Sequence, residues 1–208
     1  MSQLPAAGER SDRRARKRRQ RSDEVYGAAI ELFVERGYDA TTMDEIAERA
    51  DVARASVFNY FPRKAVFLEE WILRRRRRAV TAVQLEHLED HPIAEVLGRY
   101  LDELARINLE NTAETVALMP LTFGYIHTSP GRVPPLGDEL ASYLTCAVER
   151  GEINPAVGPA RAGLLLAYGY FGTVLKWIAE DAGSYDLGDE LHKMLDVVLS
   201  GILPPQHP

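Results

Sequence analysis

A short polar segment has side chains suited to contacting the bases of a nucleic acid. An arginine can pair bidentately with guanine, an asparagine with adenine, and an alanine or phenylalanine can touch a thymine methyl group. Val57 and Phe61, four residues apart, form the natural inward pair of a short helix over residues 54–60. The side chains left pointing outward are those of Arg54, Ala55, Ser56, Phe58 and Asn59.

Two helices joined by a tight turn must hold this segment in place. Thr42 to Glu45 form a Thr-x-x-Glu capping box, which opens the first helix. The apolar face of that helix is Met43, Ile46, Ala47 and Ala50. A break at Asp51-Val52 leads into the second helix. Such a pair, over residues 42–61, is a helix-turn-helix: one helix fits the major groove, about 12 Å wide, and the other crosses it.

The charge of the chain is distributed unevenly. The 208 residues have a formal net charge of -6, but residues 1–78 hold 18 Lys/Arg against 13 Asp/Glu, and residues 79–208 hold 7 against 18. A basic first third is expected where one end of a protein meets a polyanion. Residues 1–21 contain eight basic and few apolar side chains, so we expect a flexible arm. This arm either contributes to DNA binding without base specificity or is a disordered charged tail.

Hydrophobic periodicity near 3.6 residues begins at about Asp23 and predicts an all-α fold of about nine helices. The first helix ends at Gly37, and a long fourth helix runs from Arg63 to about Leu88. Five further helices are expected near residues 93–110, 112–127, 135–150, 160–182 and 187–202. No credible strand pair or internal repeat is present in the sequence. The domains are then the arm (1–21), a helix-turn-helix domain (22–66) and a second helical domain (67–208).

Five consecutive arginines, Arg74 to Arg78, form the most conspicuous charge run. At about 100° per residue they sweep more than a full helical turn, so they cannot present one face to DNA. The apolar stripe of the fourth helix passes near Arg75 or Arg76, so at least one of these must extend toward solvent or find a carboxylate. We interpret the run as a solvated collar, paired in part with the acidic half. A general electrostatic attraction for DNA is the alternative.

Several classes of protein are disfavoured by the sequence. A single cysteine, Cys146, excludes an internal disulfide and fits a reducing cytoplasm. The most membrane-like stretch has 14 uncharged residues, Ala162 to Leu175, short of the roughly 20 that span a bilayer. No catalytic or nucleotide-binding motif occurs, and the five histidines lack the spacing of metal ligands. We therefore expect a soluble cytoplasmic protein that is not an enzyme and has no cofactor, metal or membrane partner.

The segments ERGYDATTMDEIAERA (Glu35 to Ala50) and SVFNYFPRK (Ser56 to Lys64), with Val52 between them, resemble the TetR (tetracycline-repressor-like) transcriptional regulators. The match covers about residues 25–70. The resemblance implies a homodimeric repressor that binds a palindromic double-stranded DNA operator and is released by a small-molecule inducer. The alternatives are a ligand-independent or co-repressor-dependent regulator, or an activator on the same scaffold.

The resemblance also implies roles for individual residues. Thr42 would cap the second helix beside a phosphate, and Tyr60 and Lys64 would hold phosphates, Lys64 from the first turn of the fourth helix. The bases would face Arg54, Ala55, Ser56 and Phe58, with Asn59 contacting either a base or the backbone. Phosphate contacts set register and affinity, whereas base contacts set sequence preference.

Three positions depart from the pattern of the family. Asp51 stands where glycine is common, so the turn must tolerate a left-handed aspartate. Ala53 replaces the usual Ser or Thr N-cap, a change that costs about 1 kcal/mol in an ordinary helix. Phe58 stands where tyrosine is frequent, so a hydroxyl contact is lost there.

The second domain would hold the dimer interface and the inducer pocket. The last two helices resemble the dimerising pair of the family, and three glycines (Gly163, Gly169 and Gly172) would allow another helix to approach closely. Candidate pocket residues are Trp71, Tyr100, Leu104, Met119, Phe123, His127, Tyr168 and Trp177. The competing interpretation is that these side chains are simply core. The acidic charge of this half favours a neutral or cationic ligand, unless it belongs to the surface alone.

Overall fold

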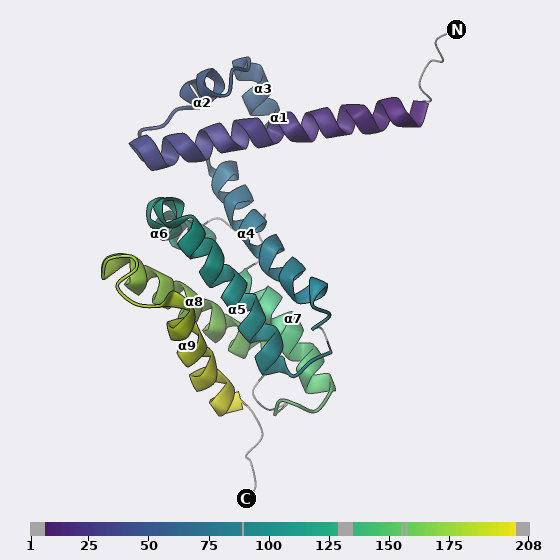
Figure 1. Ribbon diagram of the computed structural model, residues 1–208, viewed down its shortest axis with the longest axis vertical. Helices are drawn as coiled ribbons and strands as arrows, with labels where there is room; N and C mark the ends of the chain where they lie inside the picture. The colour runs from purple at the N-terminus through teal and green to yellow at the C-terminus, as the bar shows by residue number, and fades with distance from the viewer. Residues whose placement is uncertain (1–6, 89, 129–134, 155, 157, 203–208) are drawn as a thin grey trace, which may run out of the picture. The chain divides into compact units, whose positions relative to one another are not determined.

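The computed structural model describes residues 7–88, 90–128, 135–154, 156 and 158–202. Within these residues the chain forms nine α-helices and no strand, so the predicted all-α class is confirmed (Figure 1). The helices are α1 (Ala7–Arg36), α2 (Met43–Arg49), α3 (Arg54–Tyr60), α4 (Ala65–Leu85), α5 (Ile93–Glu110), α6 (Thr112–Thr128), α7 (Leu136–Glu149), α8 (Pro159–Ala179) and α9 (Leu187–Ile202). The described chain divides into two compact units, Met1–Leu68 and Glu69–Pro208.

The first unit is held together by a small aromatic and aliphatic core. Val57 of α3 and Ile46 of α2 are fully buried, and the ring of Phe61 stacks on that of Phe67 with centroids 4.1 Å apart. Phe67 also meets Phe33 of α1 edge to face. The predicted inward pair, Val57 and Phe61, is therefore confirmed, and its burial fixes which face of α3 is left for solvent.

Residues 7–21 differ from the expected flexible arm, because they are helical and continue α1 without a break. Their composition explains this: no glycine or proline interrupts residues 9–26, and Arg, Lys, Gln and Ala are good helix formers. Side-chain pairs along the helix add support, since Gln20 and Arg21 both bond to Glu24 at 3.1–3.2 Å. Low hydrophobicity prevents this segment from forming a core of its own. It does not prevent the segment from extending a helix whose later turns are packed.

The second unit is a bundle in which α7 packs against α8, α8 against α9, and α5 against both α7 and α9. Helix α8 is apolar on most of its surface and at 21 residues is long enough to cross a membrane by length and composition. Buried side chains from Ala162 to Trp177 account for this apolar character, since they face α7 and α9. The apolar run is thus used, in large part, as the core of a helical bundle.

Helices α7 and α8 approach closely at two glycines. A Cβ atom on Gly163 would lie 2.3 Å from the carbonyl oxygen of Gly137 and 2.7 Å from the backbone nitrogen of Ala141. Both neighbours are backbone atoms of α7, so they cannot rotate away as a side chain can. The sequence predicted close helix approach at Gly163, Gly169 and Gly172, and for Gly163 the partner is a helix of the same chain.

We predict that Gly163→Ala destabilises the protein by about 1–3 kcal/mol, because the new methyl group forces α7 and α8 apart. Chemical denaturation followed by circular dichroism measures this loss. Gly27→Ala is the control: nothing lies within 4 Å of its Cβ position, so replacing a glycine inside α1 raises helix stability by about 0.5–1 kcal/mol. Equal stability of Gly163→Ala and the native protein would contradict the close approach.

Candidate nucleic-acid interface and ligand cavity

The start of α2 is fixed by the predicted capping box. The hydroxyl of Thr42 accepts from the backbone N–H of Glu45 at 3.2 Å, and the backbone N–H of Thr42 donates to the Glu45 carboxylate at 2.8 Å. The same N–H, with the Thr42 hydroxyl and the Arg36 guanidinium, holds the pKa of Glu45 below its usual value. Thr42 is the N-cap of α2 and is exposed. A phosphate group is favoured at such a helix N-terminus.

The turn between α2 and α3 adopts the geometry that its sequence requires. Asp51 has φ of 50°, in the left-handed region, as expected of an aspartate that replaces glycine. The backbone N–H of Val52 donates to the carbonyl of Ala47 at 3.0 Å and closes the turn. Ala53 stands at the N-cap with no side-chain hydrogen bond, so α3 begins without the usual cap.

The outward face of α3 holds the side chains predicted to contact bases. Arg54, Ala55, Phe58 and Asn59 are exposed, while Ser56 and Tyr60 are half-buried. Arg54 does not extend freely: its Nε lies 2.9 Å from a carboxylate oxygen of Asp44 on α2, and its guanidinium lies 5.5 Å from the centre of the Phe58 ring. Asp44 and Phe58 therefore orient the arginine that has the strongest potential for recognising guanine.

Lys64 lies directly before α4, and its ammonium group contacts the loop between α1 and α2. Nζ donates to the carbonyl oxygens of Tyr38, Asp39 and Thr41 at 2.6, 3.2 and 3.1 Å, and it lies 4.4 Å from the centre of the Tyr38 ring. An ammonium group has three N–H donors, so this set of acceptors matches its capacity. The geometry favours a role in positioning this loop over the phosphate contact that the resemblance implies.

A further ion pair ties α2 to α1. Arg49 of α2 makes a bidentate contact with Glu35 of α1, at 3.0 and 2.7 Å, and also reaches Glu31 at 3.3 Å. The guanidinium of Arg49 lowers the pKa of Glu35. This pair fixes how α2 lies on α1. In the sequence, its signal was limited to the opposite charges of these residues.

The arginine run Arg74 to Arg78 is distributed around α4 and is matched largely by acidic side chains. Arg74 and Arg77 contact Glu70, each at 2.8 Å, and Arg78 lies 3.0 Å from Glu110. The predicted pairing with the acidic half is thus confirmed for Arg76, with Glu139, and for Arg78. A fully solvated collar is wrong, however, because Arg75 and Arg76 are only 7% and 6% exposed.

The two buried arginines are held by polar groups from three other helices. Arg75 donates to the side-chain oxygens of Asn108 on α5 and Thr115 on α6, and its guanidinium lies 4.2 Å from the centre of the Trp71 ring. Arg76 pairs with Glu139 of α7, whose other oxygen accepts from the Tyr100 hydroxyl at 2.6 Å. Burial, with the nearby carboxylate of Glu139, raises the pKa of Tyr100 well above its usual value.

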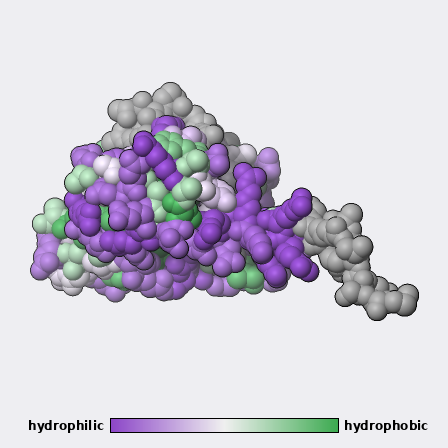
Figure 2. Space-filling model, turned by 90° about the horizontal axis from the view of Figure 1, so that it is seen from above, coloured by the Kyte–Doolittle hydropathy of each residue, from purple (hydrophilic) through white to green (hydrophobic). Residues whose placement is uncertain are grey.

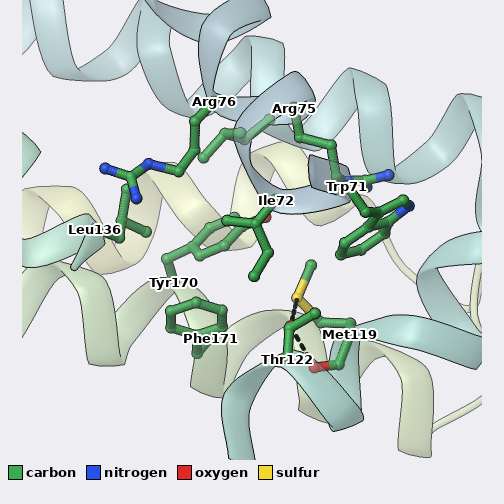
Figure 3. A pocket seen from close by; sticks show the side chains of 10 residues that line it. Trp71, Ile72, Arg75, Arg76, Met119, Thr122, Leu136, Tyr170 and Phe171 are labelled. Atoms are coloured by element: carbon green, nitrogen blue, oxygen red, sulfur yellow. Dashed lines mark hydrogen bonds between the residues drawn. The ribbon is translucent and has the colours of Figure 1, made fainter. Parts of the chain in front are cut away.

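A small cavity of about 30 Å³ lies in the second unit, beside these arginines. Its lining residues are Trp71, Ile72, Arg75, Arg76, Leu104, Met119, Thr122, Leu136, Tyr170 and Phe171. Figure 3 shows Ile72, Met119 and Phe171 facing its centre, with the two guanidinium groups directed to opposite sides. The space is enough for about one water molecule, so a larger ligand enters only if side chains such as Met119 move.

The predicted pocket residues differ in where they lie relative to the cavity. Trp71, Leu104 and Met119 line the cavity. Tyr100 and Trp177 are fully buried core side chains away from its lining, Tyr168 is 44% exposed, and Phe123 packs edge to face on Phe171. His127 lies in α6, but its side chain is outside the described residues.

The sequence prediction missed the polar lining of the cavity, chiefly Arg75, Arg76 and Tyr170. The apolar stripe of α4 passing through the arginine run was the available signal. Both charged residues in the lining are arginines, and Arg76 is paired with Glu139, so the net charge of the whole half does not describe the charge beside this cavity.

Comparison with known proteins places these features in a family. The family model described as "Bacterial regulatory proteins, tetR family" matches residues 25–71. The crystal structure of FadR from Thermus thermophilus, described as a TetR family transcriptional repressor in complex with lauroyl-CoA, is 30% identical, with a TM-score of 0.66 over 90% of this chain and 97% of that protein. The chain belongs to the TetR family.

Other TetR-family relatives agree with this assignment. The transcriptional repressor KstR of Mycolicibacterium smegmatis is 24% identical over 173 residues, which are 83% of this chain and 84% of KstR. The regulator YdeS of Bacillus subtilis is 39% identical over 49 residues, but these are only 24% of this chain and 25% of YdeS. As a TetR-family member, the protein is a DNA-binding transcriptional regulator rather than a member of an enzyme family.

The position of Lys64 leads to a prediction that separates its two roles. Lys64→Met removes the charge and leaves three loop carbonyls without their donor, so we expect a loss of about 1–3 kcal/mol in unfolding free energy. The salt dependence of DNA binding should stay unchanged. Lys176→Met, at an exposed lysine, is the control for stability. A salt slope lower by about 0.9 at unchanged stability would instead identify Lys64 as a phosphate contact.

Proposed function

We propose that the protein is a homodimeric repressor that binds a palindromic operator in the cytoplasm and is released by a small-molecule inducer. The observation that carries this proposal is the outward face of α3, where Arg54, Ala55, Phe58 and Asn59 are exposed while Val57 is fully buried. An arginine, an asparagine and two apolar groups on one such face are able to discriminate base pairs in the major groove. Thr42 and Tyr60 are proposed to contact phosphates beside it.

A two-fold dimer is supported by apolar side chains that the single chain leaves exposed. On α8, Leu164, Leu165 and Tyr168 are 46%, 56% and 44% exposed, and on α9 Val197 is 74% exposed. Burying these side chains against a second copy of α8 and α9 would form a four-helix bundle across the two-fold axis. Two copies of α3 would then meet the two halves of a palindrome.

The cavity of the second unit is the proposed inducer site. It combines apolar walls with a few polar groups that can orient a ligand, which is typical of small-molecule sites. The crystal structure of the Thermus thermophilus relative contains lauroyl-CoA, so a long-chain acyl-CoA is the first compound to test. Two buried guanidinium groups beside the cavity are compatible with a ligand that bears negative charge.

Helix α4 is the proposed connection between ligand and DNA. Residues Ala65–Leu68 belong to the first unit, and the remainder of the helix, including Trp71, Arg75 and Arg76 beside the cavity, belongs to the second. A ligand that binds better to the conformation with mis-spaced α3 helices lowers operator affinity. The size of this effect is limited by the difference between the ligand's affinities for the two conformations.

The base contacts of Arg54 generate a prediction on specificity. Arg54→Ala should relax the preference at one base pair in each half-site by about 1–3 kcal/mol. Tyr60→Phe should weaken binding to all sequences alike. Selection of bound sequences from a random library measures both effects. Arg54→Ala combined with Asp44→Asn, which removes the carboxylate together with the arginine, is the control for the uncovered Asp44 of the single variant. An unchanged preference in Arg54→Ala would mean that another face of α3 contacts the bases.

The proposed inducer site is tested by filling it. Met119→Trp places a bulkier side chain in the cavity, so lauroyl-CoA, or any other compound found to release the operator, should lose its effect while operator affinity stays unchanged. Val116→Trp introduces the same side chain at an exposed position of α6 and should keep the response. The operator is first located by footprinting upstream of the protein's own gene. Fluorescence anisotropy with the labelled operator then measures its release by each ligand.

The same titration distinguishes the alternative regulators. An increase in operator affinity on adding ligand would indicate a co-repressor, and no change with any compound would contradict ligand control. Melting curves of both tryptophan variants verify that they are folded.

A further inference from the structure

The N-terminal part of α1 has a basic stripe, which consists of Arg14, Lys17, Arg18 and Arg21. These positions have the spacing i, i+3, i+4 and i+7, so they lie on one face of the helix about 100° wide. All four side chains are exposed. Arg21 bonds to Glu24 at 3.1 Å with both side chains accessible to solvent, and such surface pairs contribute little and are readily exchanged.

The opposite face of the same helix has a different charge pattern. It consists of Asp12, Arg16, Arg19 and Asp23, which repeat at i, i+4, i+7 and i+11. Two carboxylates and two guanidinium groups give this face no net charge, whereas the basic stripe has four positive charges. Positive charge is therefore concentrated on one side of the segment, which its overall composition does not reveal.

The basic stripe lies on the same face of α1 as the later residues of this helix that pack against the helix-turn-helix. Its spacing continues from Arg21 through Val25, Ala28 and Leu32, which are 0%, 7% and 1% exposed. The next position in the series, Glu35, contacts Arg49 of α2 at 2.7 Å. Within the first unit, the stripe thus extends along the side on which α2 lies, beyond the last packed turn of the helix.

Figure 1 shows this end of α1 extending past α2 and α3, and Figure 2 shows it as a projecting hydrophilic surface. From Arg14 to Arg21 the basic stripe rises about 10 Å at 1.5 Å per residue. Double-stranded DNA has one phosphate charge per about 1.7 Å of its axis, so several phosphates lie within such a length.

The composition of the segment favours DNA over a lipid surface. A helix that lies on a membrane needs an apolar face, but Ala15 is the single apolar residue between positions 12 and 23. Guanidinium and ammonium groups on an exposed helix are the side chains that neutralise a phosphate backbone. This unit also holds the exposed α3 face.

We infer that the basic stripe of α1 binds the phosphate backbone of DNA that flanks the operator half-site. This inference rests on the proposed function, since it assumes that α3 enters the groove of a specific site. The stripe adds affinity through counterion release, independent of sequence. It also lengthens the DNA that each subunit needs for full affinity.

The test compares two double variants with the same change in charge. Arg14→Gln/Arg18→Gln removes two charges from the stripe, and Arg16→Gln/Arg19→Gln removes two from the opposite face. Glutamine has nearly the helix propensity of arginine, so α1 is retained in both. We expect the stripe variant to lower the slope of log Kd against log salt concentration by about 1.8, and the opposite-face variant to leave it nearly unchanged.

DNA length provides a second measurement. The native protein should bind an operator extended by about one helical turn on each side roughly tenfold more tightly than one trimmed to its half-sites. The stripe variant, which keeps Lys17 and Arg21, should show a clearly smaller difference between the two duplexes. Preference for the operator over a scrambled duplex of equal length should persist in all three proteins, because α3 is unchanged.

Three results would overturn the inference. Equal losses of slope in the two double variants would mean that net charge alone attracts DNA. No loss in either would mean that the stripe makes no DNA contact. Loss of binding to phosphatidylglycerol vesicles in the stripe variant, with unchanged DNA binding, would assign the stripe to lipid. Failure of the proposed function is separate, because the native protein would then show no preference for any sequence over the scrambled duplex.

Discussion

The organisation of the second unit depends on the burial of Arg75 and Arg76 beneath its surface. A buried guanidinium is costly unless polar groups surround it, so Asn108, Thr115 and Glu139 must occupy fixed positions. These three partners come from α5, α6 and α7, and all of them converge on α4. The packing of four helices is therefore tied to the position of one, and any ligand that displaces these arginines alters several helix contacts together.

The first unit meets a different requirement, which is to present α3 in a fixed orientation on a small core. The capping box of Thr42 and the left-handed Asp51 are local devices, whereas Lys64 contacts a loop 23 to 26 residues earlier in the chain. The bidentate pair of Arg49 with Glu35 adds a connection between α2 and α1. Together these contacts hold α2, α3 and the loop before α2 in place, as expected for a rigid site on short helices.

Local patterns in the sequence predicted the helices well, because caps, periodicity and glycine breaks are encoded within a few residues. They predicted that at least one of Arg75 and Arg76 would extend toward solvent or find a carboxylate. They did not predict that both are buried, since the partners lie 33 to 63 residues away. Residue type alone identified Trp71, Leu104 and Met119 beside the cavity, and equally selected Tyr100 and Trp177, which serve the core. The helix over residues 7–21 was missed because composition measures the ability to form a core rather than helix propensity.

The ion pair between Arg54 and Asp44 has a consequence for the search along DNA. In the proposed complex with DNA, a carboxylate beside the groove would be repelled by the phosphate backbone and would compete with the bases for the guanidinium. Among the bases, guanine accepts two hydrogen bonds from an arginine and would best replace the lost partner. Asp44 would then penalise residence on incorrect sequences more than on the operator, without making a favourable contact with DNA itself.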